Sequence, residues 1–401
     1  MKYFNSLVIL LLLFVQLSLS SQSLNKLKSS KLQSSNFIEK LDFTFKNNVI
    51  ILTDVKVVGS DEKFNFILDS GSEYSFISKD IARKIKFQPH LSEEITDGFE
   101  NKGIALGLMN FQLGSVLFND VGVSIMENNP IMDKICNIDG YIGYNLMKSC
   151  VWQLGLDEII ITDKIKNMKE LGSYHKQKLY DGPTVEAGFT NGFNSTMLFD
   201  LGDNGTIEIQ ESRMDLIKEK EITTGVGQLY TTGLGMGNRS NTSVHNLIEV
   251  PEFNLGKHAI TDMVVYTANS PTLPIDAIGA GILNYYKIIL DFPKKRFFSL
   301  NINDKYIDPG FRTHGLKYEI VENKVIVSFV WNNSPAYKSG IRVGQQVVKI
   351  DEIYINDLLS LNQCAIQEYL RETLEKEEIT LLLFETNSFI TLNKDRLFNT
   401  K

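Results

Sequence analysis

Two aspartates in this chain occupy the same local pattern, at positions 69 and 200. Asp69 ends the apolar run FNFILD and Asp200 ends NSTMLFD, and Gly71 and Gly202 each follow two positions later. Two carboxyl groups that a fold holds about 3 Å apart cannot both ionise, so they share one proton. One carboxylate can then act as a general base on water while its protonated partner donates to a carbonyl oxygen. The pattern would support acid–base chemistry if the fold brings the two loops together.

The segments around each Asp favour this interpretation over an ordinary turn, although Asp, Ser and Gly are common turn formers. An apolar pair, Phe76 and Ile77, follows the first motif. Downstream, each half of the chain has an apolar-apolar-Gly strand, ending at Gly143 in DGYIGYN and at Gly279 in DAIGAGI. Each half therefore reads as strand, D-x-G, helix, hairpins, apolar-apolar-Gly and a final strand pair. This repeat predicts two similar lobes.

Composition excludes several other classes of protein. With 401 residues, of which 43% are hydrophobic, the chain can bury more than one core and should form two or three domains. The net charge of -7, without long runs of Lys and Arg, argues against a nucleic-acid partner. Three cysteines cannot form a disulfide framework. No zinc-binding spacing, HExxH, GxSxG or phosphate-binding loop occurs, so we expect neither a metal nor a cofactor.

Short runs of Val, Ile, Phe and Leu separated by Gly, Asn and Asp predict a mainly β chain. Helical periodicity is limited to residues 77–85, 212–220 and 361–376. We therefore expect only a few helices, each placed between strands.

The N-terminus has the composition of a secretory signal peptide. One early Lys, an apolar run from Leu7 to Val15 and small residues at Ser18 and Ser20 place the signal in residues 1–20. Residues 21–36 would then be a pro-segment or a flexible tail. No other segment is long and apolar enough to cross a membrane, so we expect an exported protein, periplasmic or extracellular, without a stable membrane span.

The duplicated motifs resemble the pepsin and retropepsin group of aspartic proteases in a single-chain form. The resemblance runs from about Phe37 to Asn303 and implies a mainly β, two-lobed fold, with lobes at 37–170 and 171–303. It implies an aspartic-type endopeptidase acting on a peptide or protein substrate, with Asp69 and Asp200 as the catalytic pair. The residues that it implies in support are Ser70, Gly71, Ser72, Gly202, Ile142, Gly143, Ile278 and Gly279.

Within this group, Ser70 would hydrogen-bond across to the other lobe and Ser72 would orient the outer oxygen of Asp69. The second lobe departs from the pattern because Leu201 and Asp203 stand at the matching positions. Leu201 cannot donate a hydrogen bond, and Asp203 adds a third acid that should favour a retained proton. We expect Leu201→Thr to stabilise the loops slightly, unless Leu201 is packed in a core.

A further departure concerns the hairpin that would close over substrate. Asp97 falls where a Tyr is normal for the group, and Gly98 and Phe99 follow it. Phe99 could supply an apolar lid, but the segment is equally consistent with a surface hairpin. In the second half, the Gly-rich stretch TTGVGQLYTTGLGMGN suits a mobile binding loop or a plain linker.

The last hundred residues, from about 310 to 397, resemble a PDZ domain, a partly open β-barrel with helices. The similarity lies in a strand, an Asn-Ser-Pro-Ala turn, a short helix and the strand VVKID, although Gln345 replaces the usual Asp. PDZ domains bind extended peptides at a sheet edge and receive a terminal carboxylate on main-chain amides. The resemblance implies such a loop at Gly315, Leu316 and Lys317 and a C-terminal peptide as partner. A capping module without a ligand is the alternative.

Two hypotheses follow from these features. The first is an exported aspartic endopeptidase whose PDZ module recruits substrate or regulates access. The second is a catalytically impaired, protease-like scaffold or peptide-binding protein, suggested by Leu201, Asp203 and Asp97. The retention of both aspartates and both apolar-apolar-Gly strands favours the enzyme.

Overall fold

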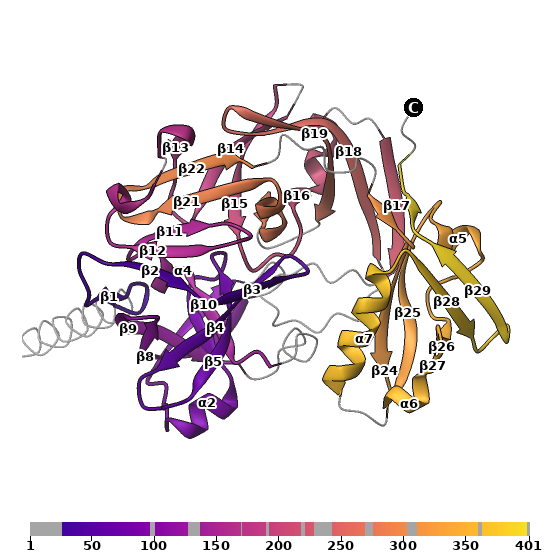
Figure 1. The fold of residues 1–401 in the computed structure, drawn as a ribbon, viewed down its shortest axis with the longest axis horizontal. Helices are drawn as coiled ribbons and strands as arrows, with labels where there is room; N and C mark the ends of the chain where they lie inside the picture. Colours follow the sequence, from indigo (N-terminus) through magenta and orange to yellow (C-terminus); the bar gives the residue numbers. More distant parts are fainter. Residues whose placement is uncertain are drawn as a thin grey trace, which may run out of the picture.

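The structure is a computed structural model that describes residues 26–96, 101–126, 137–169, 171–189, 192–217, 221–227, 243–268, 276–302, 311–359 and 363–398. Within these ranges the chain forms sheets of nine, six, thirteen and two strands (Figure 1). The prediction of a mainly β protein is confirmed. The α-helices are α2 (Lys79–Lys84), α4 (Tyr144–Met147), α5 (Pro335–Lys338), α6 (Ile355–Leu359) and α7 (Gln363–Glu375). The segment predicted as a helix at 212–220 instead contains a 3-10 turn, η3 (Glu211–Leu216).

The nine-stranded sheet is the first lobe. Its strands are β1 (Lys31–Leu32), β3 (Phe43–Lys46), β4 (Val49–Val57), β5 (Lys63–Asp69), β6 (Ser75–Ile77), β7 (Leu91–Thr96), β8 (Asn101–Leu113), β9 (Val116–Ile125) and β10 (Gly140–Gly143). Asp69 ends β5, whose last four residues are buried. β10 runs parallel to β5 and places Gly143 beside Asp69.

The second lobe repeats this arrangement. Its strands are β14 (Thr184–Phe189), β15 (Asn194–Asp200), β16 (Ile207–Gln210), β17 (Glu221–Gly227), β18 (Ser243–Leu255), β19 (His258–Ala268) and β20 (Ala277–Gly279). Asp200 ends β15, and the parallel strand β20 places Gly279 beside it, as Gly143 lies beside Asp69. The pairs β6–β9 and β16–β19 are likewise both parallel. The strand registers therefore show the repeat that the two motifs predict.

The six-stranded sheet joins the lobes. It consists of β2 (Ile38–Leu41), β11 (Val151–Leu154), β12 (Ile159–Thr162), β13 (His175–Lys178), β21 (Tyr286–Asp291) and β22 (Arg296–Asn301). The strand pair β11–β21 crosses from one half of the chain to the other. Backbone hydrogen bonds thus hold the halves in one register.

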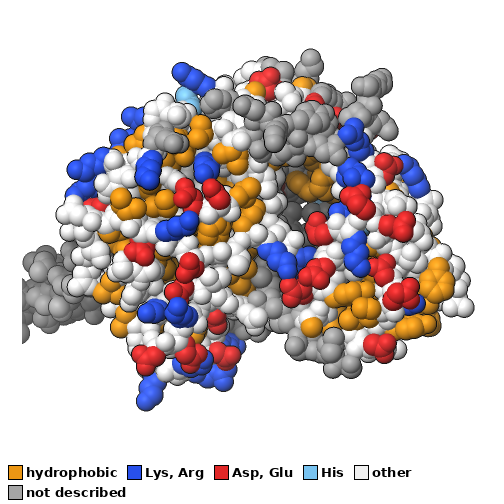
Figure 2. Space-filling view, viewed as in Figure 1, with side chains coloured by type: hydrophobic (Ala, Val, Ile, Leu, Met, Phe, Trp, Pro, Cys, Tyr) orange, Lys and Arg blue, Asp and Glu red, His pale blue; other side chains and the backbone are white. Residues whose placement is uncertain are grey.

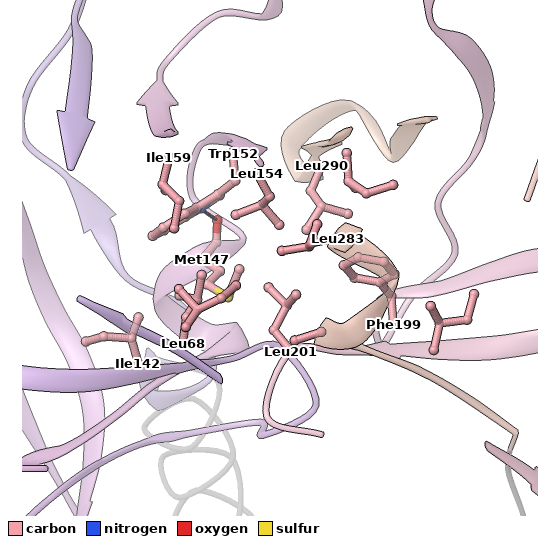
Figure 3. Packing of buried hydrophobic residues seen from close by; sticks show 14 of the residues in the cluster. Leu68, Ile142, Met147, Trp152, Leu154, Ile159, Phe199, Leu201, Leu283 and Leu290 are labelled. Carbon is pink, nitrogen blue, oxygen red and sulfur yellow. Dashed lines mark hydrogen bonds between the residues drawn. The ribbon is translucent and has the colours of Figure 1, made fainter. Parts of the chain in front are cut away.

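A continuous apolar core lies between this sheet and the two Asp loops. Leu68 and Met147 from the first half contact a cluster that also contains Phe199, Leu201 and Leu283 from the second (Figure 3). The side chain of Leu201 is only 1% exposed. Leu201 is therefore a packing residue of the core that both lobes share.

The described part of the segment expected to be a flexible tail or pro-segment is folded onto the first lobe. β1 pairs with β9, and Leu27 is fully buried. The Asn145 side-chain amide donates to the Leu27 carbonyl oxygen (3.1 Å). Residues 26–36 are therefore not a free tail, because they bury apolar surface and use backbone hydrogen bonds. The predicted signal peptide, residues 1–20, lies outside the described residues.

The C-terminal module, residues 311–398, continues the sheet of the second lobe. Its strands are β23 (Arg312–Thr313), β24 (Leu316–Val321), β25 (Lys324–Trp331), β26 (Gln346–Ile350), β27 (Ile353–Tyr354), β28 (Glu378–Leu383), β29 (Ser388–Asn393) and β30 (Asp395–Arg396). β25 pairs with β17, so strands of the module and of the second lobe form one thirteen-stranded sheet. The module also has an apolar core of its own, which includes Val327, Val347 and Ile379.

The burial of Leu201 reverses the expectation of a stabilising Leu201→Thr change. We now expect this variant to lower the free energy of unfolding by about 2 to 4 kcal/mol, because it removes buried methyl groups and adds a hydroxyl to an apolar site. Urea unfolding measures the loss. Leu156→Thr is the matched control, since Leu156 is 40% exposed and surface changes usually stay within about 0.5 kcal/mol. Equal stabilities of the two variants would contradict the packing role.

Candidate active site

Asp69 and Asp200 lie against each other where the two lobes meet. A Cβ atom built on Gly71 would be 2.3 Å from the Asp200 carboxyl carbon, and one on Gly202 would be 2.5 Å from that of Asp69. Each glycine thus lies against the aspartate of the other lobe. The two carboxyl groups therefore lie near each other, and the pKa of each depends on the other. Any side chain in place of either glycine would force the carboxyls apart.

Backbone amides of the tight D-x-G turns hold each carboxylate. The Ser72 amide donates to Asp69 Oδ1 (2.9 Å), and the Gly202 amide donates to Asp200 Oδ1 (2.8 Å). Because these donors belong to the turns, the backbone itself fixes the orientation of each carboxylate.

Ser70 links the lobes as the resemblance implied. Its hydroxyl donates to the Phe199 carbonyl oxygen (2.5 Å) and accepts from the Leu201 amide (3.0 Å). Leu201 provides no hydroxyl for the reciprocal link, and its side chain points into the core instead. One half of the usual bridge is therefore replaced by apolar packing.

The role expected for Ser72 needs correction. Its hydroxyl donates to the Tyr74 carbonyl oxygen (2.8 Å) and holds the chain after the turn, while its amide contacts Asp69. The carboxylate is thus oriented by main chain, because the only proton of the hydroxyl is used elsewhere.

The apolar-apolar-Gly strands support the loops from behind. Ile142 and Ile278 are fully buried in the shared core. A Cβ atom on Gly143 would be 2.2 Å from the Tyr74 carbonyl oxygen, and one on Gly279 would be 2.3 Å from that of Gly205. Both glycines permit a close approach between the strand and the neighbouring Asp loop.

The surroundings of the pair favour a retained proton. Asp69 is 8% exposed, and burial is the main reason why its pKa lies above the usual value. Burial also raises the pKa of Asp200, and the negative charge of Asp69 raises it further. The interaction between the carboxyls lowers the pKa of Asp69 and raises that of Asp200. Burial and the mutual repulsion of two negative charges therefore favour one retained proton, which belongs to the pair as a unit.

Two further acids lie close to the pair on the second lobe. Asp203 is 8% exposed, and its Oδ1 accepts the Gly205 amide (2.8 Å). Burial, followed by the charges of Asp203 and Asp200, raises the pKa of Glu208 to about 8. Asp203 also raises the pKa of Asp69. The acidic surroundings therefore add to the effect of burial.

Sequence reasoning missed the charged anchor behind Asp200. Asp276 is fully buried and accepts hydrogen bonds from Arg213 (2.6 Å), the Gln210 amide (2.9 Å) and the Ser195 hydroxyl. Asp139 has the matching place before β10 and accepts the Asn65 amide (2.8 Å). An Asp just before each apolar-apolar-Gly strand was the available signal.

The remaining expected site residues are only partly placed. Asp97, Gly98 and Phe99 lie outside the described residues. Gly315 has a left-handed backbone (φ +87°), and its amide donates to the Thr313 hydroxyl (3.0 Å). Leu316 is buried in β24, and Lys317 is exposed. The Gly315 amide is thus already used, which removes it from the expected carboxylate-binding set.

Neither a metal centre nor a membrane helix is seen in the described ranges. No three His, Cys, Asp or Glu residues there are grouped so that they could hold a metal ion. None of the helices in the described part of the chain has the length and hydropathy needed to cross a bilayer.

Comparison with known proteins supports an aspartic-protease relationship for the first lobe. Residues 53–146, which run from β4 to α4 and include Asp69, match the family model described as Aspartyl protease. No curated protein sequence matches the chain. Among solved structures, an aspartic proteinase from Irpex lacteus has a TM-score of 0.43 and 10% identity, covering 66% of this chain and 97% of its own. That likeness is too low to assign a fold, so the two-lobed interpretation rests on the strand registers.

The raised pKa values of the pair predict how stability depends on pH. Below about pH 4, the usual Asp pKa, these carboxyls are protonated in both the folded and the unfolded chain, so their contribution is fully present. As pH rises, the unfolded chain releases protons that the folded pair retains, and stability falls. The side chain of the Asp200→Asn variant cannot ionise. We therefore expect the free energy of unfolding of this variant to increase relative to that of the wild type as the pH rises from 4 to 8.

Urea unfolding at several pH values tests this expectation. Asp181→Asn is the control, because Asp181 is exposed and its hydrogen bond with Lys295 lowers its pKa, which reverses the sign. Parallel wild-type and Asp200→Asn curves would show that the pair does not retain a proton.

Proposed function

We propose that this protein is an aspartic endopeptidase, with Asp69 and Asp200 as its catalytic residues. The observation that carries the proposal is the close approach of two backbone-held carboxyls, each lying against the glycine of the opposite turn, which admits no side chain. The family match of residues 53–146 supports the same reaction class. A peptide or protein is the substrate, and the mechanism requires neither a metal nor a cofactor.

The proposed mechanism uses the one proton that the pair retains, which we place on Asp200. Ionised Asp69 takes a proton from a bound water as the water oxygen attacks the scissile carbonyl carbon. Asp200 donates its proton to the carbonyl oxygen, giving a tetrahedral diol. When the C–N bond breaks, the proton held by Asp69 passes to the leaving nitrogen, and the diol returns a proton to Asp200. The products are a carboxylic acid and an amine, and both carboxyls regain their starting states.

The alternative, an impaired scaffold, rests on the second-lobe departures. The structure offsets the first departure. Leu201 lacks the hydroxyl of the bridge, but its side chain packs in the shared core and the two carboxyls remain together. Asp203 leaves the pair intact and increases its tendency to hold a proton. We therefore expect these departures to change the pH at which the enzyme is active, and not to abolish its activity.

We further propose that the protein is exported and that the C-terminal module binds peptides. The first proposal is supported by the composition of residues 1–20, and the second by the PDZ-like pattern of residues 310–397. In the structure, α7 and β24 belong to one apolar core, to which Leu316 and Ile366 contribute. A peptide strand added along β24 would lie on the edge that does not face β25.

The catalytic proposal predicts non-additive mutants. Asp69→Asn and Asp200→Asn should each remove nearly all cleavage of an unfolded protein at acidic pH, by roughly 10³-fold or more in kcat, and the double mutant should be little worse. Release of new N-termini measures the rate, and a statine-type mimic of the tetrahedral state should inhibit the wild type.

Asp181→Asn is a suitable control for this series, because it removes an exposed carboxyl outside the pair. Retained cleavage in Asp200→Asn alone would indicate a dimer that uses Asp69 twice. Undiminished cleavage in both single variants would end the proposal.

The peptide-binding proposal predicts a preference for free C-termini, received on main-chain amides other than that of Gly315. Hexapeptides of random sequence with a free carboxylate should bind the full-length protein roughly 10-fold or more tightly than their amidated forms, since charge-assisted hydrogen bonds contribute about 1.5 to 3 kcal/mol. Fluorescence anisotropy on the Asp69→Asn variant avoids cleavage. Equal binding of both forms would favour a capping module.

A further inference from the structure

The second-lobe hairpin formed by β17 and β18 is the counterpart of the first-lobe hairpin formed by β7 and β8. Each hairpin follows the D-x-G strand and precedes the strand that returns to the apolar-apolar-Gly segment. Both are antiparallel, and the second strand of each pairs onward with the next, β8 with β9 and β18 with β19. The repeat therefore gives β17 the position in the second lobe that β7 has in the first.

The outer edge of β17 is occupied by the C-terminal module. Gly225 and Gly227 of β17 lie opposite Trp331 and Phe329 of β25. The contact extends beyond the strand pair, because the Asn332 amide donates to the Thr224 carbonyl oxygen (2.8 Å) and its side chain to the Thr224 hydroxyl (2.5 Å). Main-chain pairing thus joins the module to this hairpin.

Gly225 makes the contact sterically feasible. A Cβ atom there would be 2.2 Å from Phe329 and 2.6 Å from Trp331, whose rings are buried. A Cβ atom on Gly103, in the first-lobe hairpin, would meet no neighbouring atom within 4 Å. The glycines at the start of the Gly-rich stretch therefore serve packing against the module, which neither the binding-loop nor the linker interpretation anticipated.

An aromatic cluster connects the module to strands β18 and β19 of the second lobe. Phe311 and Trp331 of the module contact Tyr266 of β19, with ring centroids 6.3 and 6.5 Å apart. Leu247 of β18, together with Leu397 and Phe398 near the chain end, completes this cluster. Closely packed aromatic side chains transmit displacement because little free volume separates them.

Tyr266 also lies on a strand that pairs with β16, the strand that follows the Asp200 turn. In the parallel pair β16–β19 it lies opposite Glu208, eight residues after Asp200. Burial raises the pKa of Tyr266, and the charge of Asp203 contributes next, as expected if the phenol lies near that carboxylate. Ring contacts from Trp331 to Tyr266 and the strand pairing of Tyr266 with Glu208 therefore connect the module to the strand that follows the Asp200 turn.

The module contacts the first lobe far less firmly. Lys46 of β3 pairs with Glu368 of α7 (2.5 Å) and lies 3.9 Å from Glu372, and all three side chains are about half exposed. Exposed ion pairs contribute only about 0 to 1 kcal/mol. Figure 2 shows charged side chains gathered where the module faces the rest of the molecule, next to a hollow. A displaced module would therefore keep its second-lobe contact and lose this one.

We propose that the C-terminal module regulates the second-lobe half of the active site through the β17–β25 strand pair and the Trp331–Tyr266 contact. The inference rests on the proposed function for its catalytic consequence, but not for the structural coupling. Tyr266 is a positioning residue that acts on the Asp200 loop through Glu208 and Asp203. Occupation of the module would alter catalysis by moving this interface.

The test uses the full-length protein and Gly225→Val, which forces Phe329 and Trp331 away from β17. Hydrogen exchange is measured by mass spectrometry over residues 203–210, with residues 72–77 of the first lobe as internal reference. We expect exchange over 203–210 to rise roughly fivefold or more while the reference is unchanged. We also expect kcat to fall roughly tenfold, with a smaller effect on KM and a shifted pH profile.

Gly103→Val is the matched control, and exchange over 203–210 should stay at the wild-type rate in that variant. Trp331→Phe is a milder second variant, in case Gly225→Val folds poorly, and should change the same quantities less. Faster exchange confined to β17 and β25, with residues 203–210 and kcat unchanged, would overturn the proposal. If the wild type cleaves no peptide, the proposed function fails, while the exchange experiment still decides whether the module and the Asp200 loop are coupled.

Discussion

The close approach of two carboxyls from different lobes is the constraint on which the rest of the structure depends. Gly71 and Gly202 set the distance, because a Cβ on either would meet the opposite aspartate. Holding two acids together in a largely apolar setting is costly unless one proton is shared. The fold meets this cost with turn amides, the Ser70 bridge, a six-stranded sheet across the halves and one continuous core. The bridge, the sheet and the core fix the lobes relative to each other, and the turn amides orient each carboxylate within its own lobe.

The parts of the site that could be predicted from the sequence are those encoded within a few residues. A D-x-G turn after an apolar strand is a local signal, and its second copy at position 200 indicated the repeat. The roles of Leu201 and Ser72 were wrong or incomplete, because they depend on which atoms of the other lobe lie nearby. The anchor of Asp276 by Arg213 was missed for the same reason. Residue type reveals that a side chain can form an ion pair, but only the fold reveals its partner.

The junction between the module and the second lobe shows the same limit over a longer range. Gly225 and Trp331 are about a hundred residues apart in sequence, and their opposition depends on a strand register that no local pattern encodes. A Gly-rich stretch is equally typical of a loop and of a tight strand contact. The structure decides between these two interpretations for the start of the Gly-rich stretch. There, Gly225 and Gly227 lie against β25 without room for a side chain.

Joining the module through a strand edge has a physical consequence that a flexible linker would not have. An unpaired edge strand exposes backbone donors and acceptors and invites association with other chains. Here β25 covers that edge of β17, while the buried aromatic cluster fixes the angle between the two parts. Separating them would expose both the edge and the cluster, so the module and the hairpin should move as one body. The weak ion pairs to the first lobe are then the easiest contact to break. A movement of the module would therefore change mainly the position of the second-lobe hairpin relative to the first lobe.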